Sequence, residues 1–391
     1  MIYIHDFSLC CALGQNTEQT LRNFLANQAP GLRESTDWLV GGVRAFFGHC
    51  VAELQDIAER HSKHDSRNNR LLLHTYKQRE SEFQALLSKY DKERVGIFLG
   101  TTTSGSDEAD QYIGDRLSQR ETNFTGYCQE LGDPARFLAK YLDIKGPSYS
   151  ICTACTSSTR AFISAAKLIE AGVIDAAFVG GVDTLARMPI NGFNSLEALS
   201  HEVCRPFASD RKGITIGEGA GLFFVSKDRS DIALLGYGET SDGFHMTAPR
   251  KDGELAAKAM TDALERAKLS PDHIAYLNLH GTGTELNDAS ETAAVRRVFK
   301  NKVNCTSTKN LIGHTLGAAG AVESGLLCAL LRADKEHRLP GQGLSEDKYD
   351  KEVLEMGLRT ESFSVVPGAM MTNNFAFGGN NATLIFGKPN E

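Results

Sequence analysis

Residues 148–158 read Ser-Tyr-Ser-Ile-Cys-Thr-Ala-Cys-Thr-Ser-Ser, a strand-like stretch that runs into a turn of small residues around Cys155. A helical stretch follows from Thr156 to Ala171, and Gly172 stands where helices commonly end in the left-handed conformation. This order predicts a strand, a tight turn and a helix, with a thiol where the helix begins. Unpaired amide groups and the helix dipole at that point favour the thiolate form.

The second half of the chain repeats this plan. Residues 303–306 read as a strand, a glycine turn carries His314, and a helix is expected from about Leu316 to Arg332. That helix is small or apolar on nearly every side, and a helix that is apolar all round is buried. Alternating strand and helix signals indicate an α/β protein. The repeated plan therefore favours a layered structure with buried helices between two sheets.

His280 follows the apolar strand expected over residues 274–279, so it emerges at a strand's carboxyl end, where ligand sites of such folds gather. A thiol that can hold an acyl group and two imidazoles that can stabilise an enolate oxygen are what carbon–carbon bond formation on thioesters needs. Each residue alone is a weak signal, because cysteines are often inert core residues and a histidine often only completes a hydrogen-bond network.

Taken in order, these segments resemble the beta-ketoacyl-acyl-carrier-protein synthases, type II ketosynthases of the thiolase superfamily. The likeness runs from about Gly146 to the carboxyl terminus and includes Arg205-Pro-Phe207, Gly217–Gly221 and Asn374-Phe-Ala-Phe-Gly-Gly379. It implies the thiolase-like, duplicated, five-layered α-β-α-β-α fold. Residues 1–230 would form the half that carries the nucleophile, and residues 231–391 the half that carries both histidines.

The resemblance also implies roles for single residues. Cys155 would accept the acyl group, and His280 and His314 would act on the malonyl group. Lys309 and Glu323 would form a charged pair around the second histidine, because a buried lysine and a buried glutamate must be paired. Thr282 and Thr284 would bind the phosphopantetheine arm. Phe377 would gate the site, and its N–H would form the oxyanion hole together with that of Cys155. Asp288 would be a structural acid near the site, although a simple helix N-terminal role explains it equally well.

The implied reaction is decarboxylative Claisen condensation of a malonyl carrier-protein thioester with the acyl group on Cys155. Thiolases use a second cysteine that residues 373–379 lack, and initiating synthases pair histidine with asparagine where His314 stands. The short segment His201–Cys204 and the opening residues 2–14 look more like synthases of bacterial aryl polyene and related type II polyketide pathways. The alternatives are a housekeeping fatty-acid elongation synthase and a non-catalytic chain-length factor, although chain-length factors replace the cysteine.

Charge and composition indicate which partners to expect. The net charge of −7 argues against nucleic-acid binding. An acidic acyl carrier protein is the implied partner, and basic clusters at Lys63, Arg67 and Arg70 or at Arg250-Lys251 could receive it, unless they are only solvated surface charge. Residues 52–90 are rich in charge and are expected to form exposed helices and connections. We also expect a dimer, either with a second copy or with a chain-length factor.

Other chemistries are disfavoured. Nine cysteines with irregular spacing do not suggest a disulfide framework. Cys152 and Cys155 form a Cys-x-x-Cys, but Cys152 belongs to the preceding strand and no second such pair would complete a zinc site. Gly217–Gly221 precedes a strand rather than a helix, so it lacks the dinucleotide-binding context. We expect no cofactor beyond the carrier's own phosphopantetheine arm. No apolar run approaches the ~20 residues of a membrane span, so we expect a cytoplasmic protein.

Overall fold

A computed structural model describes the chain except for residues 123, 125, 301–302 and 390–391. Its main sheet has the strand order β10-β9-β13-β14-β8-β1-β7-β6-β4-β5. The first-half strands are β1 (Ile2–Cys11), β4 (Val95–Gly100), β5 (Ser148–Ile151), β6 (Ala176–Asp183) and β7 (Gly219–Ser226). The second-half strands are β8 (Ile232–Ser241), β9 (Ile274–Asn278), β10 (Cys305–Thr306), β13 (Ala369–Ala376) and β14 (Asn380–Gly387).

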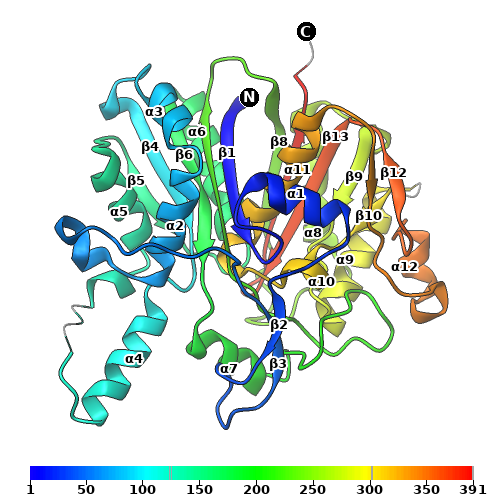
Figure 1. Ribbon diagram of the computed structural model, residues 1–391. Coiled ribbons are helices and arrows are strands. Elements are labelled where there is room, and N and C mark those ends of the chain that lie inside the picture. The colour runs from blue at the N-terminus through cyan, green and yellow to red at the C-terminus, as the bar shows by residue number, and fades with distance from the viewer. Residues whose placement is uncertain (123, 125, 301–302, 390–391) are drawn as a thin grey trace.

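The two halves of the sheet have the same topology. From the centre outward the first half runs β1-β7-β6-β4-β5, and the second runs β8-β14-β13-β9-β10. In each half the two inner pairings are antiparallel and the two outer pairings are parallel. Short antiparallel pairing of Ile2–Ile4 with 232–234 joins the halves, which lie on the left and right of Figure 1. The predicted duplication is confirmed.

Two helices fill the space between the halves, α6 (Ser157–Glu170) and α11 (Ala319–Ala333). Phe162 on α6 contacts a strand of each half, since its ring centroid lies 4.9 Å from that of Phe223 and 5.7 Å from that of Phe386. The helices approach closely at Gly320, where an added Cβ would lie 2.0 Å from Thr159 Oγ1. Small residues thus allow two buried helices to share one core, as the sequence predicts.

Further helices cover the outer faces of the sheet, and their apolar residues form one separate core cluster on each half. The first half carries α2 (Arg67–Lys77), α3 (Glu80–Leu87) and α5 (Asp133–Leu142). The second half carries α8 (Glu254–Ala267), α9 (Glu285–Val298) and α12 (Lys351–Glu355). Instead of two separate sheets, the two halves of the ten-stranded sheet supply the two β layers, and the layers follow the expected α-β-α-β-α order.

The remaining elements are peripheral or connect the layers. They are α1 (Thr17–Leu25), α4 (Ser106–Leu117), α7 (Arg187–Ser195), α10 (Lys309–Ile312) and the two-stranded sheets β2 (Leu32–Ser35) with β3 (Ala45–Gly48) and β11 (His337–Leu339) with β12 (Phe363–Val365). In Figure 1, α4, α7 and the β2–β3 hairpin extend below the main sheet.

Two expectations need correction, the absence of a long apolar run and the exposure of residues 52–90. The stretch Leu316–Ala333 is long and apolar enough, by length and composition, to cross a membrane, but 89% of it is buried inside the protein, as in a core helix. The charged segment 52–90 is not simply exposed, because α2 buries Leu71, Leu72 and Tyr76 against the outer face of the first half. Its charges lie on one face of the helix, so composition alone hid an amphipathic pattern.

Candidate active site

Cys155 lies in the turn between β5 and α6 and is buried. The preceding residue, Ala154, has a φ of +52°, a left-handed conformation that costs an L-residue about 1 kcal/mol. The Ser157 side chain holds this turn, because its Oγ donates to Ala154 O (2.5 Å) and accepts from Thr153 N–H (3.0 Å). The strained turn places the thiol just before the first residue of α6.

The Cys155 thiol is un-ionised at neutral pH. Burial raises its pKa to about 12, although the nearby Lys309 charge acts in the opposite direction. We expected the helix N-terminus to favour the thiolate; here the cost of removing a charged sulfur from water is the larger effect.

His314 faces this thiol with a defined ring nitrogen. Its Nε2 lies 3.0 Å from Cys155 Sγ, and its Nδ1 accepts a hydrogen bond from Leu316 N–H (3.3 Å). Burial and the Lys309 charge lower the pKa of His314 well below its usual value, so the ring is neutral. Because Nδ1 accepts, the single ring proton is on Nε2. His314 thus presents an N–H donor toward the sulfur.

His280 follows β9 and meets the other ring edge to face. The two imidazole centroids are 5.2 Å apart with an interplanar angle of 84°. Burial, then the Lys309 charge and the repulsion that a protonated His314 would exert, lower the pKa of His280 well below its usual value, so this ring is neutral too. Cys155 Sγ and one nitrogen of each ring all lie within 4.8 Å of one another. The structure therefore brings together the three residues that the sequence singled out.

This spacing alone would also admit a metal ion. However, the ammonium of Lys309 acts on both rings and on the thiol, and a fixed positive charge opposes a divalent cation at the same place. The Sγ to Nε2 hydrogen bond also already uses the ligand atoms of two residues. The geometry favours chemistry by the side chains themselves.

Lys309 and Glu323 form the predicted buried pair, with 2.6 Å between Nζ and Oε1. The other carboxylate oxygen of Glu323 accepts from Asn374 Nδ2 (2.8 Å), and Asn374 Oδ1 accepts from Thr159 Oγ1 on α6 (2.5 Å). Asn374 was not predicted as a site residue. It connects the charged pair on the His314 side to the helix that follows Cys155.

The loop after His280 is held by two buried carboxylates. Asp288 accepts the backbone N–H groups of Thr282 (3.1 Å) and Gly283 (3.2 Å) and that of Phe207 (2.7 Å), so it does organise the loop. Glu291, which sequence reasoning missed, accepts those of His280 (2.8 Å) and Gly281 (2.7 Å). Burial raises the pKa of Glu291 to about 7. The i, i+3 spacing of the two acids on one helix was the available sequence signal.

The remaining predicted residues lie on the same loops. Thr282 Oγ1 and Thr284 Oγ1 are 3.0 Å apart. Phe377 follows β13 two residues after Phe375, whose ring centroid is 6.1 Å from that of His280. The Phe377 side chain is 36% exposed and packs against Phe193 of α7 at 5.5 Å. Gly378 N–H donates to Met246 O (2.7 Å), so a second loop contacts the Phe377 loop.

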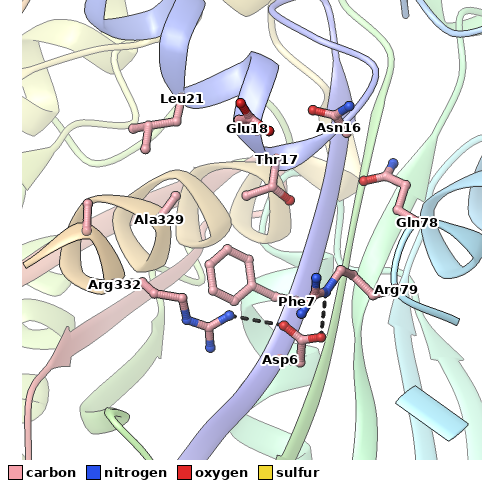
Figure 2. Close-up of a pocket in the computed structure, with 11 residues that line it drawn as sticks. Asp6, Phe7, Asn16, Thr17, Glu18, Leu21, Gln78, Arg79, Ala329 and Arg332 are labelled. Carbon is pink, nitrogen blue, oxygen red and sulfur yellow. Dashed lines mark hydrogen bonds and ion pairs between the residues drawn. The ribbon is translucent and has the colours of Figure 1, made fainter. Parts of the chain in front are cut away.

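A cavity of about 470 Å³ lies elsewhere, between β1, α1 and the last turns of α11. Figure 2 shows Asp6 held there between Arg79 and Arg332, with contacts of 2.7 and 3.0 Å. None of the predicted site residues lines this cavity. The ion pairs fix the end of α11 that is remote from His314.

The two basic clusters are largely neutralised within the chain. Arg67 binds the buried carboxylate of Glu218 (2.5 Å), and Arg70 binds Asp65 (2.6 Å). Arg250 pairs with Asp252 and Glu254. Lys63 instead lies 4.7 Å from the centroid of the Tyr127 ring, which Arg136 (4.7 Å) and Lys140 (5.8 Å) also approach.

Comparison with known proteins identifies the family. The model of the beta-ketoacyl synthase N-terminal domain matches residues 25–230, and that of the C-terminal domain matches residues 232–338. The chain belongs to the beta-ketoacyl synthase family. It is thus a condensing enzyme of the acyltransferase type.

Individual relatives agree with this family. A 3-oxoacyl-[acyl-carrier-protein] synthase 2 of Staphylococcus aureus (strain COL) is 30% identical over 317 residues, covering 76% of this chain and 75% of that protein. A solved ketosynthase, ApeO, in complex with its chain length factor, ApeC, from Xenorhabdus doucetiae is 46% identical, with a TM-score of 0.96 over 99% of this chain and 98% of that one. The ishigamide ketosynthase/chain length factor, 22% identical with a TM-score of 0.88 over 100% and 99% of the two chains, shares the fold.

Proposed function

We propose that this beta-ketoacyl synthase condenses a malonyl group, carried on an acyl carrier protein, with an acyl group held on Cys155. The observation that supports this most is the cluster of Cys155, His280 and His314, in which a thiol faces the Nε2–H of a neutral imidazole. A non-catalytic chain-length factor has no need of this assembly.

The first step is acyl transfer. The Cys155 sulfur attacks the carbonyl carbon of the incoming thioester, and the bond from that carbon to the carrier sulfur breaks. The thiol proton leaves with the carrier thiol, so the charge balances. The N–H groups of Cys155 and Phe377 would bind the oxyanion of the tetrahedral intermediate. Because burial raises the pKa of the thiol to about 12, we infer that its proton leaves as the thioester is attacked.

The second step is decarboxylation and condensation. The carbon–carbon bond to the malonyl carboxylate breaks, carbon dioxide leaves, and the enolate oxygen accepts N–H donors from His280 and His314. The enolate carbon then attacks the acyl-Cys155 carbonyl, the bond from that carbon to the Cys155 sulfur breaks, and the thiolate takes up from solvent the one proton that the condensation consumes. Burial, and then the charge of Lys309, which is paired with Glu323, keep both rings neutral by disfavouring further protonation. Thr282 and Thr284 would bind the carrier's phosphopantetheine arm.

Partners and pathway follow from the same comparison. The chain is more similar to a ketosynthase solved with its chain length factor than to a 3-oxoacyl synthase 2. This difference in identity supports a heterodimer with such a factor and a role in the aryl polyene or type II polyketide branch. We place the protein in the cytoplasm. Housekeeping fatty-acid elongation is the alternative. We assign carrier docking to Lys63 and Lys140, for which no ion pair with an acidic side chain is found in the described part of the chain.

The test is intact mass spectrometry after incubation with an acyl carrier thioester. We expect one added acyl group on the wild type and on Cys152→Ala, the exposed neighbouring cysteine, and none on Cys155→Ala. His280→Ala and His314→Ala should still be acylated but should lose about 10²- to 10³-fold in malonyl decarboxylation. Acylation of Cys155→Ala, or decarboxylation at the normal rate in either histidine variant, would contradict the assignment.

A further inference from the structure

The direction in which His314 presents its proton depends on one backbone group. Nδ1 is an acceptor only because Leu316 N–H points at it from 3.3 Å. Leu316 has a φ of +48°, in the left-handed region that a residue with a side chain occupies only when its surroundings hold it there. Something must therefore fix the turn formed by Thr315, Leu316 and Gly317.

Asp183 contacts this turn from the other half of the molecule. It is the last residue of β6 and is fully buried. Its Oδ2 accepts Gly317 N–H at 2.6 Å, one residue beyond the N–H that contacts His314. The approach leaves no room for a side chain, because a Cβ on Gly317 would lie 2.8 Å from Asp183 Oδ2.

The carboxylate is itself anchored by the loop after β4. Its Oδ1 accepts from Thr101 Oγ1, Thr102 N–H, Thr103 N–H and Thr103 Oγ1, each at 2.8 Å. Its Oδ2 also accepts from Thr102 Oγ1 at 2.7 Å. Burial raises the pKa of Asp183, and this number of donors holds its carboxyl group in one orientation.

We propose that Asp183 is a positioning residue for the condensation: by holding Gly317 N–H it keeps the strained Leu316 turn closed and so keeps the His314 proton on Nε2, facing Cys155. When the turn opens, Leu316 N–H leaves Nδ1 and the ring is free to carry its proton there instead. A bare Nε2 cannot donate to an enolate oxygen. The inference rests on the proposed role of His314 and extends it to a residue of the first half.

Asp183→Asn separates this role from general support. In the asparagine variant the amide oxygen takes the place of Oδ1, because Oδ1 accepts from more donors. The NH₂ group then takes the place of Oδ2, and Gly317 N–H loses its acceptor. Thr102 Oγ1 can rotate to accept. The matched control is Thr102→Val, which removes the other donor to Oδ2 and leaves Gly317 N–H bound.

Three readouts are compared on the full-length protein, with its partner if the two copurify. Asp183→Asn should lower malonyl decarboxylation at least 10-fold, while acylation of Cys155 changes by less than about 3-fold. Nitrogen-15 spectra of labelled histidine should show the Nε2-protonated ring of His314 in the wild type and in Thr102→Val, and a loss of that form in Asp183→Asn. Asp183→Glu, which keeps the charge but displaces the oxygens, replaces Asp183→Asn if that variant does not fold.

An unchanged His314 tautomer in Asp183→Asn would overturn the proposal. So would an equal fall of acylation and decarboxylation together with a lowered Tm, since that is loss of structure. Failure of wild-type Cys155 to accept an acyl group would instead overturn the proposed function. The tautomer measurement does not depend on activity, so the two failures are distinguishable.

Discussion

At the scale of single residues, burial and then the charge of Lys309 set the pH range in which both imidazoles stay neutral. Its ammonium is among the causes that lower the pKa of His280 and of His314. In the neutral ring of His314, Nδ1 accepts the Leu316 N–H. Protonation would place an N–H at Nδ1, where it would face the Leu316 N–H. The positive charge of Lys309 therefore helps to preserve the donor geometry of the two histidines that we propose bind the enolate oxygen.

Removing that charge should move the acid limb of the pH profile. Lys309→Met alone would leave Glu323 unpaired, a change that costs about 3–5 kcal/mol for a buried charge, so we use Lys309→Met with Glu323→Gln. Without the ammonium the pKa values of His280 and His314 rise toward their usual value. As the pH falls, malonyl decarboxylation should then be lost at a higher pH than in the wild type. Superimposable acid limbs in the two proteins would show that Lys309 does not tune the histidines.

Sequence reasoning reached the residues with distinctive local contexts and missed those defined by distant contacts. Cys155, His280 and His314 each stand beside a strand or helix end that the residue pattern reveals. By contrast, the roles of Asp183, Glu291 and Asn374 can be recognised only from the groups to which they hydrogen-bond in the folded protein. Arg67 looked like free surface charge because its partner, Glu218, is 151 residues away. The raised pKa of Cys155 was also out of reach, since burial is a property of the packed molecule.

At the scale of elements, the site depends on how closely α6 and α11 pack. Cys155 precedes one helix and His314 precedes the other, so their separation sets the distance from Sγ to Nε2. At the crossing, Gly320 faces both Thr159 Oγ1 and Thr159 N, at 2.0 and 2.9 Å from an ideal Cβ. The backbone atom cannot rotate away. The duplicated plan was visible in the sequence, but this contact between its two copies was not.

Gly320→Ala should separate the helices. Overpacking of a core typically costs about 1–3 kcal/mol, and we expect a lower Tm together with a loss of Cys155 acylation greater than the unfolded fraction explains. Gly192→Ala on α7 is the matched control, because nothing lies within 4 Å of its added Cβ and alanine is the better helix former by about 1 kcal/mol. Differential scanning calorimetry and the acylation assay would decide. Full activity with an unchanged Tm in Gly320→Ala would show that α6 and α11 can accommodate the extra methyl group without loss of stability.

At the scale of the whole molecule, the main sheet ends in a strand with an open edge. At the far end, β10 forms a bridge from Cys305 to Leu358, whereas β5 pairs on one side only, with β4, among the residues that the structure describes. Pro147 and Ile151 direct their carbonyls to β4, accepting Ile97 N–H (3.0 Å) and Thr101 N–H (3.2 Å). Since backbone groups alternate along a strand, those of Ser148 and Ser150 face away from the sheet. Cys155 follows four residues after this edge strand ends.

An open edge so near the Cys155 turn predicts that a second subunit would add to the sheet at this strand. Ser150→Pro removes an outward N–H and leaves in place the backbone groups that bond to β4. It should therefore convert a dimer, with twice the 42.6 kDa of one chain, to a monomer. Light scattering after size-exclusion chromatography would measure the mass. The effect should appear both for the chain alone and for its complex with a coexpressed chain-length factor, and Cys155 acylation should fall with the dimer. Ser150→Ala keeps the N–H and should remain dimeric. A Ser150→Pro protein that stays dimeric, with native circular dichroism, would place the subunit interface on another surface and remove the link between the partner and the Cys155 turn.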